Sequence, residues 1–417
     1  MSHKKHQKYL RATLFPVIAL AVIISIFFQI NSEDSESASI EVLKEAVDGR
    51  LHIEDSINLE ELYKNALSFK LKEAEDQSMD IWFHDGAGLT INKFSLEGRH
   101  VNSIVLPPIN EPVGLNRVSD FFVYNKDSIF VYDAQYRRLL LTNEKSDVLN
   151  LWLINNYIPE LSAGRNNEII DVYKNEKNEL KIDLTGYSNI YYQSDPNFFR
   201  KNSLVYQINL STEQVSRGLP YPEKSPYLDH LFWSGVMPYV RKAENGYLAV
   251  FPLDEKIYRY DLALAFKDVI DSKPNNFPRA IGNKYGNPQE MNFARIDRKL
   301  NGFNLKTRGV FNTHNEQVFA KIYRAPLGDH DEIPDDYASF LMGDYPSKHY
   351  LQVFKVEGDS FVKKYSDIEI SRLGLGNLLH IDGAGRYYFL KNDPESEANV
   401  IVICRPGPDN KQIAYAD

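Results

Sequence analysis

The sequence predicts an all-β fold, a β-propeller of six four-stranded blades, and three observations support it. Short runs rich in β-branched and aromatic residues, bounded by Gly, Asn, Asp and Pro, recur from Met79 to the C-terminus. Turn signals separate groups of these runs at intervals of about 40 to 70 residues, the length of a four-stranded blade with its loops. Several runs, such as IFVY, LLL and IVI, are continuously apolar, as expected for strands buried on both faces. A pair of β-sandwich domains is the alternative.

The first thirty residues predict an export segment. A basic end that includes Lys4, Lys5 and Arg11 precedes a nearly uninterrupted apolar run from Ala12 to Ile30. Basic residues stay on the cytoplasmic side, so the chain after Asn31 should cross the membrane. The length of the run and its poor cleavage signals favour an uncleaved transmembrane helix, with a cleaved signal peptide as the alternative. We therefore expect an inner-membrane anchor with the main domain in the periplasm, or a secreted protein if the segment is cleaved.

Residues 31–78 are predicted to connect this anchor (residues 1–30) to the propeller (residues 79–417). The segment Asn31 to Ser39 is small, polar and acidic, which is typical of a solvated tether. From Ile40 to Gln77 apolar residues recur at helical spacing, which predicts short stalk helices.

Predicted strands recur from Met79 to the C-terminus. The predicted strands are Ile81 to Phe83, Leu89 to Phe94, Phe121 to Tyr124, Ile129 to Tyr132, Arg138 to Thr142, Leu149 to Leu153, Leu204 to Leu210, Tyr247 to Phe251, Lys256 to Tyr260, Gln317 to Tyr323, Tyr350 to Val356, Arg386 to Leu390 and Val400 to Cys404. One late helix is predicted, at Asp261 to Asp271. Six hairpin tips are predicted at Asp85-Gly86, Lys126-Asp127, Asn178-Glu179, Asn245-Gly246, Asn315-Glu316 and Gly383-Ala384-Gly385.

Composition excludes some classes of function. The net charge is −9, and the most basic stretch in the predicted domain, Arg295 to Arg308, is short and interrupted, so nucleic acid is not an expected partner. The single cysteine, Cys404, excludes an intramolecular disulfide, and because no cysteine follows the apolar run, a lipid anchor there is excluded. Cys404 lies in the apolar run VIVIC, which predicts an inert core thiol.

The sequence contains no recognisable catalytic signature. It has no HExxH, GxSxG, GxxxxGK[ST] or GxGxxG motif. No cofactor is expected, with a structural Ca²⁺ ion as the one open alternative.

That Ca²⁺ alternative rests on the acidic run Gly328 to Asp336. Closely spaced carboxylates in a loop can supply the oxygens that Ca²⁺ requires. The candidate ligands are Asp329, Asp331, Glu332, Asp335 and Asp336. The run lacks the spacing of an EF-hand, and a solvated loop is the competing interpretation.

An aromatic segment from Pro220 to Tyr239 is the candidate ligand-binding site. Exposed aromatic side chains offer a large contact area at small entropic cost and can stack on sugars or hold extended peptides. The candidate residues are Tyr221, Tyr227, His230, Trp233 and Tyr239. The alternative is that they form a small core beneath a long loop.

Histidines near three predicted blade tips form a further candidate. If the tips gathered at the axis, His84, His314 and His380 with Asp382 could form a polar or metal-binding cluster. Surface turn residues are the competing interpretation.

Three phrases of the sequence carry a resemblance to a known group. KDSIFVYDAQYRRLLL, NGYLAVFPLDEKIYRYDL and LLHIDGAGRYYFLKN follow a pattern of a polar tip, an apolar strand, Asp, then Arg or Tyr and a second strand. They resemble the units of six-bladed β-propeller proteins from Bacteroidota cell envelopes, a group largely of uncharacterised domains and often lipoproteins. The resemblance implies a propeller from Met79 to the end, and it implies no catalytic residues.

These observations together predict an envelope-anchored, non-catalytic binding, sensor or scaffold module. The expected partners are the membrane, through the N-terminal helix, and a peptide, protein or glycan ligand. The alternative is a propeller-fold hydrolase or lyase with its site at the axial opening. An enzyme would require at least two titratable groups from different blades within hydrogen-bond reach of each other.

Overall fold

The computed structural model describes thirteen ranges of the chain that exceed a single residue. They are residues 39–40, 49–59, 68–73, 79–84, 88–163, 167–191, 197–228, 236–278, 301–305, 309–326, 347–358, 360–391 and 399–408. Residue 195 is described as well. The chain divides into two compact units, Met1–Ser39 and Ile40–Asp417. Within the described residues no helix is both long and apolar enough to span a membrane. The predicted anchor, Ala12 to Ile30, lies outside them.

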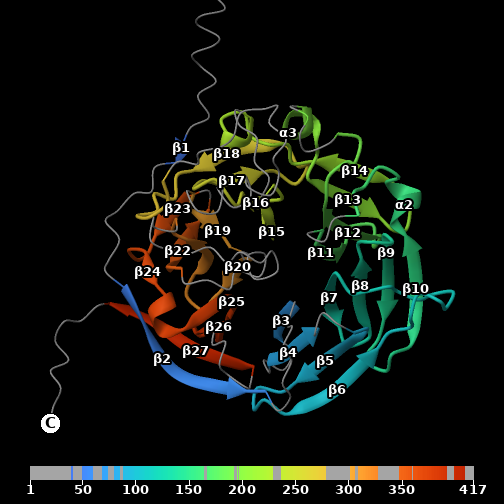
Figure 1. Ribbon diagram of the computed structural model, residues 1–417, viewed down its shortest axis with the longest axis horizontal. Coiled ribbons are helices and arrows are strands. Elements are labelled where there is room, and N and C mark those ends of the chain that lie inside the picture. The colour runs from blue at the N-terminus through green and yellow to red at the C-terminus, as the bar shows by residue number, and fades with distance from the viewer. Residues whose placement is uncertain are drawn as a thin grey trace, which may run out of the picture. The chain divides into compact units, whose positions relative to one another are not determined.

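The second unit is a ring of six antiparallel sheets, which confirms the predicted six-bladed propeller (Figure 1). Blade 1 consists of β3 (Ser68–Glu73), β4 (Met79–His84), β5 (Thr90–Phe94) and β6 (His100–Val105). Blade 2 consists of β7 (Asp120–Asn125), β8 (Ser128–Asp133), β9 (Arg138–Thr142) and β10 (Val148–Leu153). Blade 3 consists of β11 (Ile169–Lys174), β12 (Leu180–Thr185), β13 (Val205–Asn209) and β14 (Val215–Gly218).

The remaining blades repeat this pattern. Blade 4 consists of β15 (Tyr239–Ala243), β16 (Gly246–Val250), β17 (Ile257–Tyr260) and β18 (Phe266–Ile270). Blade 5 consists of β20 (Gly309–Asn312), β21 (Gln317–Arg324), β22 (His349–Glu357) and β23 (Ser360–Lys363), with β19 (Phe303–Asn304) and β24 (Ile368–Glu369) paired to β21 and β22. The other short elements are β1 (Ser39–Ile40), α2 (Ile154–Tyr157), α3 (Asn197–Lys201), η1 (Pro226–Leu228) and η2 (Ser371–Leu373).

Blade 6 joins the two ends of the propeller. Its strands are β25 (Leu375–Ile381), β26 (Tyr387–Lys391) and β27 (Val400–Pro408), and its outermost strand is β2 (Gly49–Asn58), from the start of the domain. Strands β2 and β27 pair antiparallel from Gly49 opposite Pro408 to Asn58 opposite Val400. Figure 1 shows this pairing of a blue with a red strand. The ring is therefore closed by backbone hydrogen bonds between distant parts of the chain.

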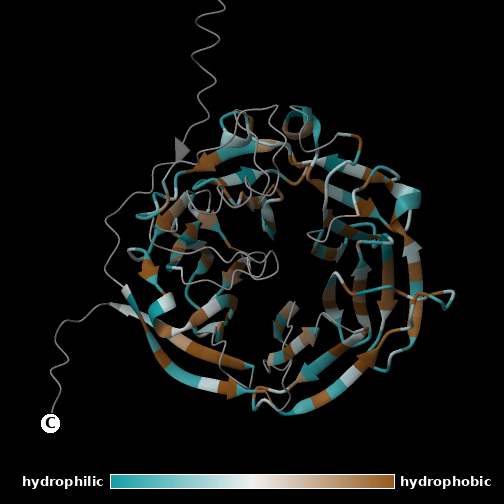
Figure 2. Cartoon of the chain, in the orientation of Figure 1, coloured by the Kyte–Doolittle hydropathy of each residue, from teal (hydrophilic) through white to brown (hydrophobic). Residues whose placement is uncertain are grey.

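The apolar core lies between the blades. Among the described residues, six clusters of buried side chains each combine residues from two neighbouring blades. Strands β16 and β17 are buried at every position, and Figure 2 shows apolar residues along most strands of the ring. Both faces of a blade are covered by neighbours, which explains the continuous apolar runs in the sequence.

Most predicted local features are confirmed. Five of the six predicted hairpin tips join the first and second strands of blades 2 to 6, so they are equivalent turns. The sixth, Asp85-Gly86, falls between β4 and β5, and its residues lie outside the described ranges.

Two helical predictions are wrong. Residues 49–58 and 68–73, in the predicted helical stalk, are strands β2 and β3, so the propeller begins before the predicted residue 79. In β2 the ladder with β27 contains a bulge between Ile53 and Asp55, and this irregularity masks the two-residue alternation of a strand. The late helix predicted at Asp261 to Asp271 contains a turn and β18, because pairing with β17 outweighs the helix preference of its Leu and Ala residues.

Candidate functional site

The first strands of the six blades surround the propeller axis, and those of blades 1 to 4 carry charged residues near their starts. In Figure 1, β3, β7, β11, β15, β20 and β25 are the innermost strands. Ion pairs join blade 1 to blade 2 and blade 3 to blade 4, and a hydrogen bond from a backbone N–H joins blade 2 to blade 3. We call the set Lys70, Asp120, Glu168, Asp171, Arg241 and Lys242 the axial charges.

Asp120 connects three blades. Its Oδ1 lies 2.9 Å from Nζ of Lys70 in β3, and its Oδ2 accepts a hydrogen bond of 2.9 Å from the backbone N–H of Ile169 at the start of β11. The Asp120 side chain is 1% exposed, whereas that of Lys70 is 24% exposed. The carboxylate is thus fixed inside the protein, while its cationic partner reaches toward solvent.

The next pair joins blades 3 and 4. Nη1 of Arg241 in β15 lies 3.6 Å from Oε2 of Glu168, which directly precedes β11. Arg241 faces blade 5, where Gly309 lies at the start of β20, and a Cβ atom at Gly309 would lie 3.7 Å from Cδ of Arg241. At 3.6 Å the Arg241–Glu168 pair is longer than a charge-assisted hydrogen bond.

Lys242 holds two carboxylates on blade 3. Asp171 of β11 and Asp183 of β12 are direct cross-strand partners, and Nζ of Lys242 lies 2.9 Å from the first and 3.6 Å from the second. The Asp183 side chain is fully buried. Burial raises the pKa of Asp183 to about 6, against the opposing effects of its hydrogen bond from Tyr247 and the charge of Lys242.

Two tyrosines complete this cluster. Tyr247 donates a hydrogen bond of 2.6 Å to Oδ2 of Asp183, and Nζ of Lys242 lies 3.0 Å from the ring centroid of Tyr173. Burial raises the pKa of both tyrosines above its ordinary value. Both hydroxyls therefore stay protonated at neutral pH and act as hydrogen-bond donors.

A second polar cluster, between blades 4 and 5, is buried. Lys321 is 0% exposed, and its Nζ donates to the Glu255 carbonyl at 2.7 Å. Burial lowers the Lys321 pKa to about 7. Asp367 accepts hydrogen bonds from Tyr323 and Gln352. Because Lys321 of blade 5 donates to a backbone carbonyl of blade 4, we interpret this cluster as a link between blades.

Three of the five aromatic candidates lie in the described part of the chain. Tyr221 and Tyr227 are buried, with 4% and 0% exposure, and the Tyr221 hydroxyl donates to the Val236 carbonyl. Their placement matches the alternative of a core beneath a loop. Tyr239 is half-buried at the start of β15, on the same face of the strand as Arg241, two residues later.

The remaining predicted ligand-binding and calcium-binding residues lie outside the described part of the chain. His230 and Trp233 lie outside it, as do the candidate calcium ligands Asp329, Asp331, Glu332, Asp335 and Asp336. Across the described ranges no group of three or more His, Cys, Asp and Glu side chains is placed to hold a metal ion.

The predicted histidine candidates do not form a group placed to hold a metal ion in the described part of the chain. His84 bonds the Gly88 carbonyl, and the backbone N–H of His314 donates to the Gly383 carbonyl. Burial lowers the pKa of His380 to about 4. Cys404 is buried in blade 6, as predicted, and burial raises its pKa to about 11.

Sequence reasoning missed the axial charges. Charged residues in strands normally indicate a solvated face, and nothing in the local sequence shows that Lys70, Asp120 and Arg241 meet at one axis. The position of these three residues is the usable signal, because Lys70, Asp120 and Arg241 each lie within the first three residues of an innermost strand.

The fold and the axial charges define a six-bladed β-propeller whose axis is lined by preformed ion pairs. Among solved structures, the chain is similar to a member of the DUF4221 family from Bacteroides vulgatus, with 15% identity, a TM-score of 0.63 and coverage of 87% of this chain and 100% of that one. It also matches a protein from Bacteroides fragilis that is named an exported protein, at 14% identity and a TM-score of 0.47, covering 86% and 95% of the two chains.

A calcium-binding protein, regucalcin, from Agrobacterium tumefaciens matches at 10% identity and a TM-score of 0.41, covering 87% and 97% of the two chains. No family model matches the sequence, and no curated protein matches it. The resemblance to uncharacterised Bacteroidota propellers is confirmed at the level of the fold.

Proposed function

We propose that this protein is a non-catalytic binding module held at the cell envelope, which recognises its ligand through the axial charges. One observation carries the proposal: four blades contribute charged side chains that form ion pairs between neighbouring blades. The pairs hold both signs of charge in fixed positions, so the site is preorganised for a ligand with charged or hydroxyl groups. A peptide, a protein or a glycan provides such groups.

The proposed location at the cell envelope rests on the N-terminal sequence. The apolar run Ala12 to Ile30 follows a basic end, which favours insertion with the propeller outside the cytoplasm. A periplasm-active phosphatase fused after Asp417 should be active, whereas a cytoplasm-active reporter fused at the same place should not. The opposite pattern would contradict the proposed location.

Binding at the axis is tested with the full-length protein. We would measure the affinity of a panel of short peptides and oligosaccharides by calorimetry, first with the native protein and then with Arg241→Met. Removing the guanidinium should weaken the selected ligand about tenfold or more, since a hydrogen bond to a charged group contributes about 1.5–3 kcal/mol. The matched control is Arg99→Met, because the Arg99 side chain is 70% exposed and forms an ion pair with exposed Glu97. Equal affinities of both variants would exclude the axis as the binding site.

One observation favours the alternative, a hydrolase or lyase. Lys242 of blade 4 and Asp171 of blade 3 are titratable groups from different blades at 2.9 Å, and Asp183 behind them has a pKa raised to about 6 by burial. A group with a pKa near neutrality suits general acid–base chemistry. Turnover of any panel compound that Asp183→Asn abolishes would replace the binding proposal with this alternative.

A further inference from the structure

The guanidinium group of Arg241 has one edge without a partner in the described part of the chain. Both of its polar contacts are made by Nη1, which donates a hydrogen bond of 2.6 Å to the Val240 carbonyl and lies 3.6 Å from Oε2 of Glu168. Among the described residues, Nε and Nη2 have no hydrogen-bond partner. These two nitrogens are not among the buried polar atoms that lack a partner, so both are open to solvent.

The contacts of Arg241 fix the direction of this edge. The hydrogen bond to Val240 holds the guanidinium against its own strand, and Cδ lies beside Gly309 of blade 5. The Arg241 side chain is 13% exposed, so it has little conformational freedom to lose when a ligand binds. Nε and Nη2 are a pair of donors that can hold a carboxylate by two parallel hydrogen bonds. A carboxylate bound there leaves the contact between Nη1 and Glu168 intact.

Neighbouring carboxylates limit the charge that a ligand can carry. The Glu168 side chain is 17% exposed and that of Asp171 is 26% exposed, and both would repel a second anionic group. The same carboxylates can accept hydrogen bonds from hydroxyl groups. A ligand with one carboxylate and several hydroxyl groups therefore fits this surrounding better than a polyanion.

Tyr239 adds an aromatic surface beside Arg241. It begins β15 and lies on the face of the strand that carries Arg241. Two residues of a strand in this relation are about 7 Å apart, a separation that one sugar ring with its carboxylate can span. Aromatic rings offer a flat apolar surface on which the C–H face of a sugar can pack.

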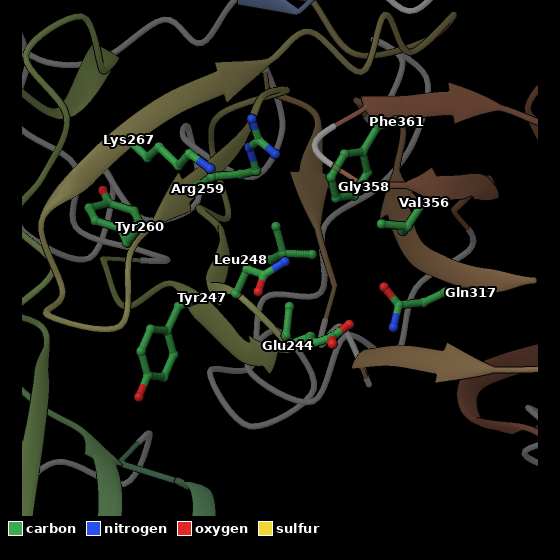
Figure 3. Close-up of a pocket in the computed structure, with 13 residues that line it drawn as sticks. Glu244, Tyr247, Leu248, Arg259, Tyr260, Lys267, Gln317, Val356, Gly358 and Phe361 are labelled. Carbon is green, nitrogen blue, oxygen red and sulfur yellow. The ribbon is translucent and has the colours of Figure 1, made fainter.

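The small pocket between blades 4 and 5 is a different place. Its volume is about 100 Å³, and Arg241 is not among its lining residues. In Figure 3 the hydroxyl of Tyr247, which lines this pocket, points away from it, and the same hydroxyl donates to Asp183 of blade 3. Binding at Arg241 therefore does not involve this pocket.

We propose that the ligand of the axial site is an acidic sugar, a hexuronate unit of a glycan, whose carboxylate binds to Nε and Nη2 of Arg241. The hydroxyl groups of the sugar contact the carboxylates of Glu168 and Asp171, and its ring packs against Tyr239. This inference rests on the proposed function, because it names the ligand class of the same site.

The first test compares two matched probes by ligand-observed NMR titration of the full-length protein. The methyl glycoside of D-glucuronic acid carries the carboxylate, and methyl D-glucoside has a neutral hydroxymethyl group in its place. The glucuronide should bind about tenfold or more tightly than the glucoside, as expected for a charge-assisted contact. Equal affinities, or no binding of the glucuronide at millimolar concentration, would overturn the inference.

Two variants assign the contact to residues. Arg241→Lys keeps the positive charge but loses the pair of parallel donors, so the preference for the glucuronide over the glucoside should fall about tenfold. Glu168→Gln should bind the glucuronide about two- to fivefold more tightly, because a nearby anion is removed. The matched control is Arg99→Lys at an exposed position, which should keep the native preference. An unchanged preference in Arg241→Lys, or weaker glucuronide binding by Glu168→Gln, contradicts the assignment.

N-acetylglycine distinguishes a sugar from a peptide, because it presents the carboxylate of a peptide terminus without a sugar ring. It should bind about tenfold more weakly than the glucuronide, and equal affinity would overturn the inference in favour of a peptide ligand. Failure of this inference differs from failure of the proposed function. If the glucuronide does not bind but another compound of the panel loses affinity in Arg241→Met, the ligand class is wrong and the axial site stands.

Discussion

Lys242 shows how a single residue can couple two blades, because it contacts both Asp171 and Asp183 of the neighbouring blade. Direct cross-strand carboxylates repel one another, yet these two are adjacent partners of β11 and β12. Lys242 of the neighbouring blade forms an ion pair with each of them. The contact between blades 3 and 4 therefore depends on the protonation state of the buried Asp183 carboxyl group.

This dependence predicts a change in stability with pH. Burial raises the pKa of Asp183 in the folded protein to about 6, above the value of about 3.9 in an unfolded chain. Between these values the folded protein binds more protons than the unfolded chain, so the contribution of Asp183 to stability is greatest below pH 4 and decreases as the pH rises to about 6. The decrease is at most about 3 kcal/mol, from 1.36 kcal/mol for each pKa unit.

Asp183→Asn tests the prediction, because asparagine keeps an oxygen that can accept the Tyr247 hydrogen bond but does not titrate. The free energy of unfolding by urea would be measured for both proteins from pH 4 to pH 7. The native protein should lose stability relative to Asp183→Asn over this range. If the free energies of unfolding of the two proteins changed in parallel with pH, the pKa of Asp183 would be the same in the folded and the unfolded chain.

At the scale of elements, local sequence predicted those strands whose partners are close in the chain. The turns at Asn178 and Asn245-Gly246 were recognisable because residues there favour positive φ: φ is 61° at Asn178 and 146° at Gly246. Alanine at Gly246 would place its Cβ 2.0 Å from the Tyr260 carbonyl oxygen. Such turns are encoded locally, and five of them marked equivalent positions in the blades.

Strand β2 was not predicted, because its partner strand is distant in the sequence. Its partner β27 lies near the other end of the chain, and Glu54 and Arg405, which form an ion pair across the two strands, are 351 residues apart. A pattern read within the N-terminal segment cannot indicate such a partner. The axial charges were missed similarly, because only ring closure places residues of different blades around one axis.

The two faces of β2 predict different effects of mutation. Ile57 is 5% exposed and packs in the cluster between blades 6 and 1, whereas Ile53 on the same strand is 54% exposed. Ile57→Ala should lower the free energy of unfolding by about 2–4 kcal/mol, because it removes buried methyl groups and leaves a cavity. Ile53→Ala should change it by less than about 0.5 kcal/mol.

Urea unfolding of both variants and the native protein provides the measurement. The mutated residue type is the same and both sites lie in one strand, so differences in β propensity largely cancel. Equal effects of the two substitutions would mean that β2 is not packed on the ring in solution as described here.

At the scale of the whole propeller, closure by β2 and β27 determines how the ring unfolds. In a linear repeat array each repeat contacts only its neighbours, and a terminal repeat can detach after losing a single interface. In the closed ring each blade has two interfaces filled by apolar clusters, so no blade is terminal. We therefore expect one cooperative transition, in which tryptophan fluorescence and far-UV circular dichroism change together.

Deleting residues 400–417 should abolish this behaviour. The deletion removes β27, and with it buried Ile401, Val402 and Cys404 and the backbone partner of β2. The opened ring should unfold at a lower urea concentration, and its two signals should no longer coincide, because blade 1 and blade 5 become ends. Deletion of residues 409–417 alone keeps β27 whole and is the matched control. Were the longer deletion to unfold with the native midpoint and coincident signals, the stability of the blades would come from neighbouring contacts alone, and closure would serve only to position the axial charges.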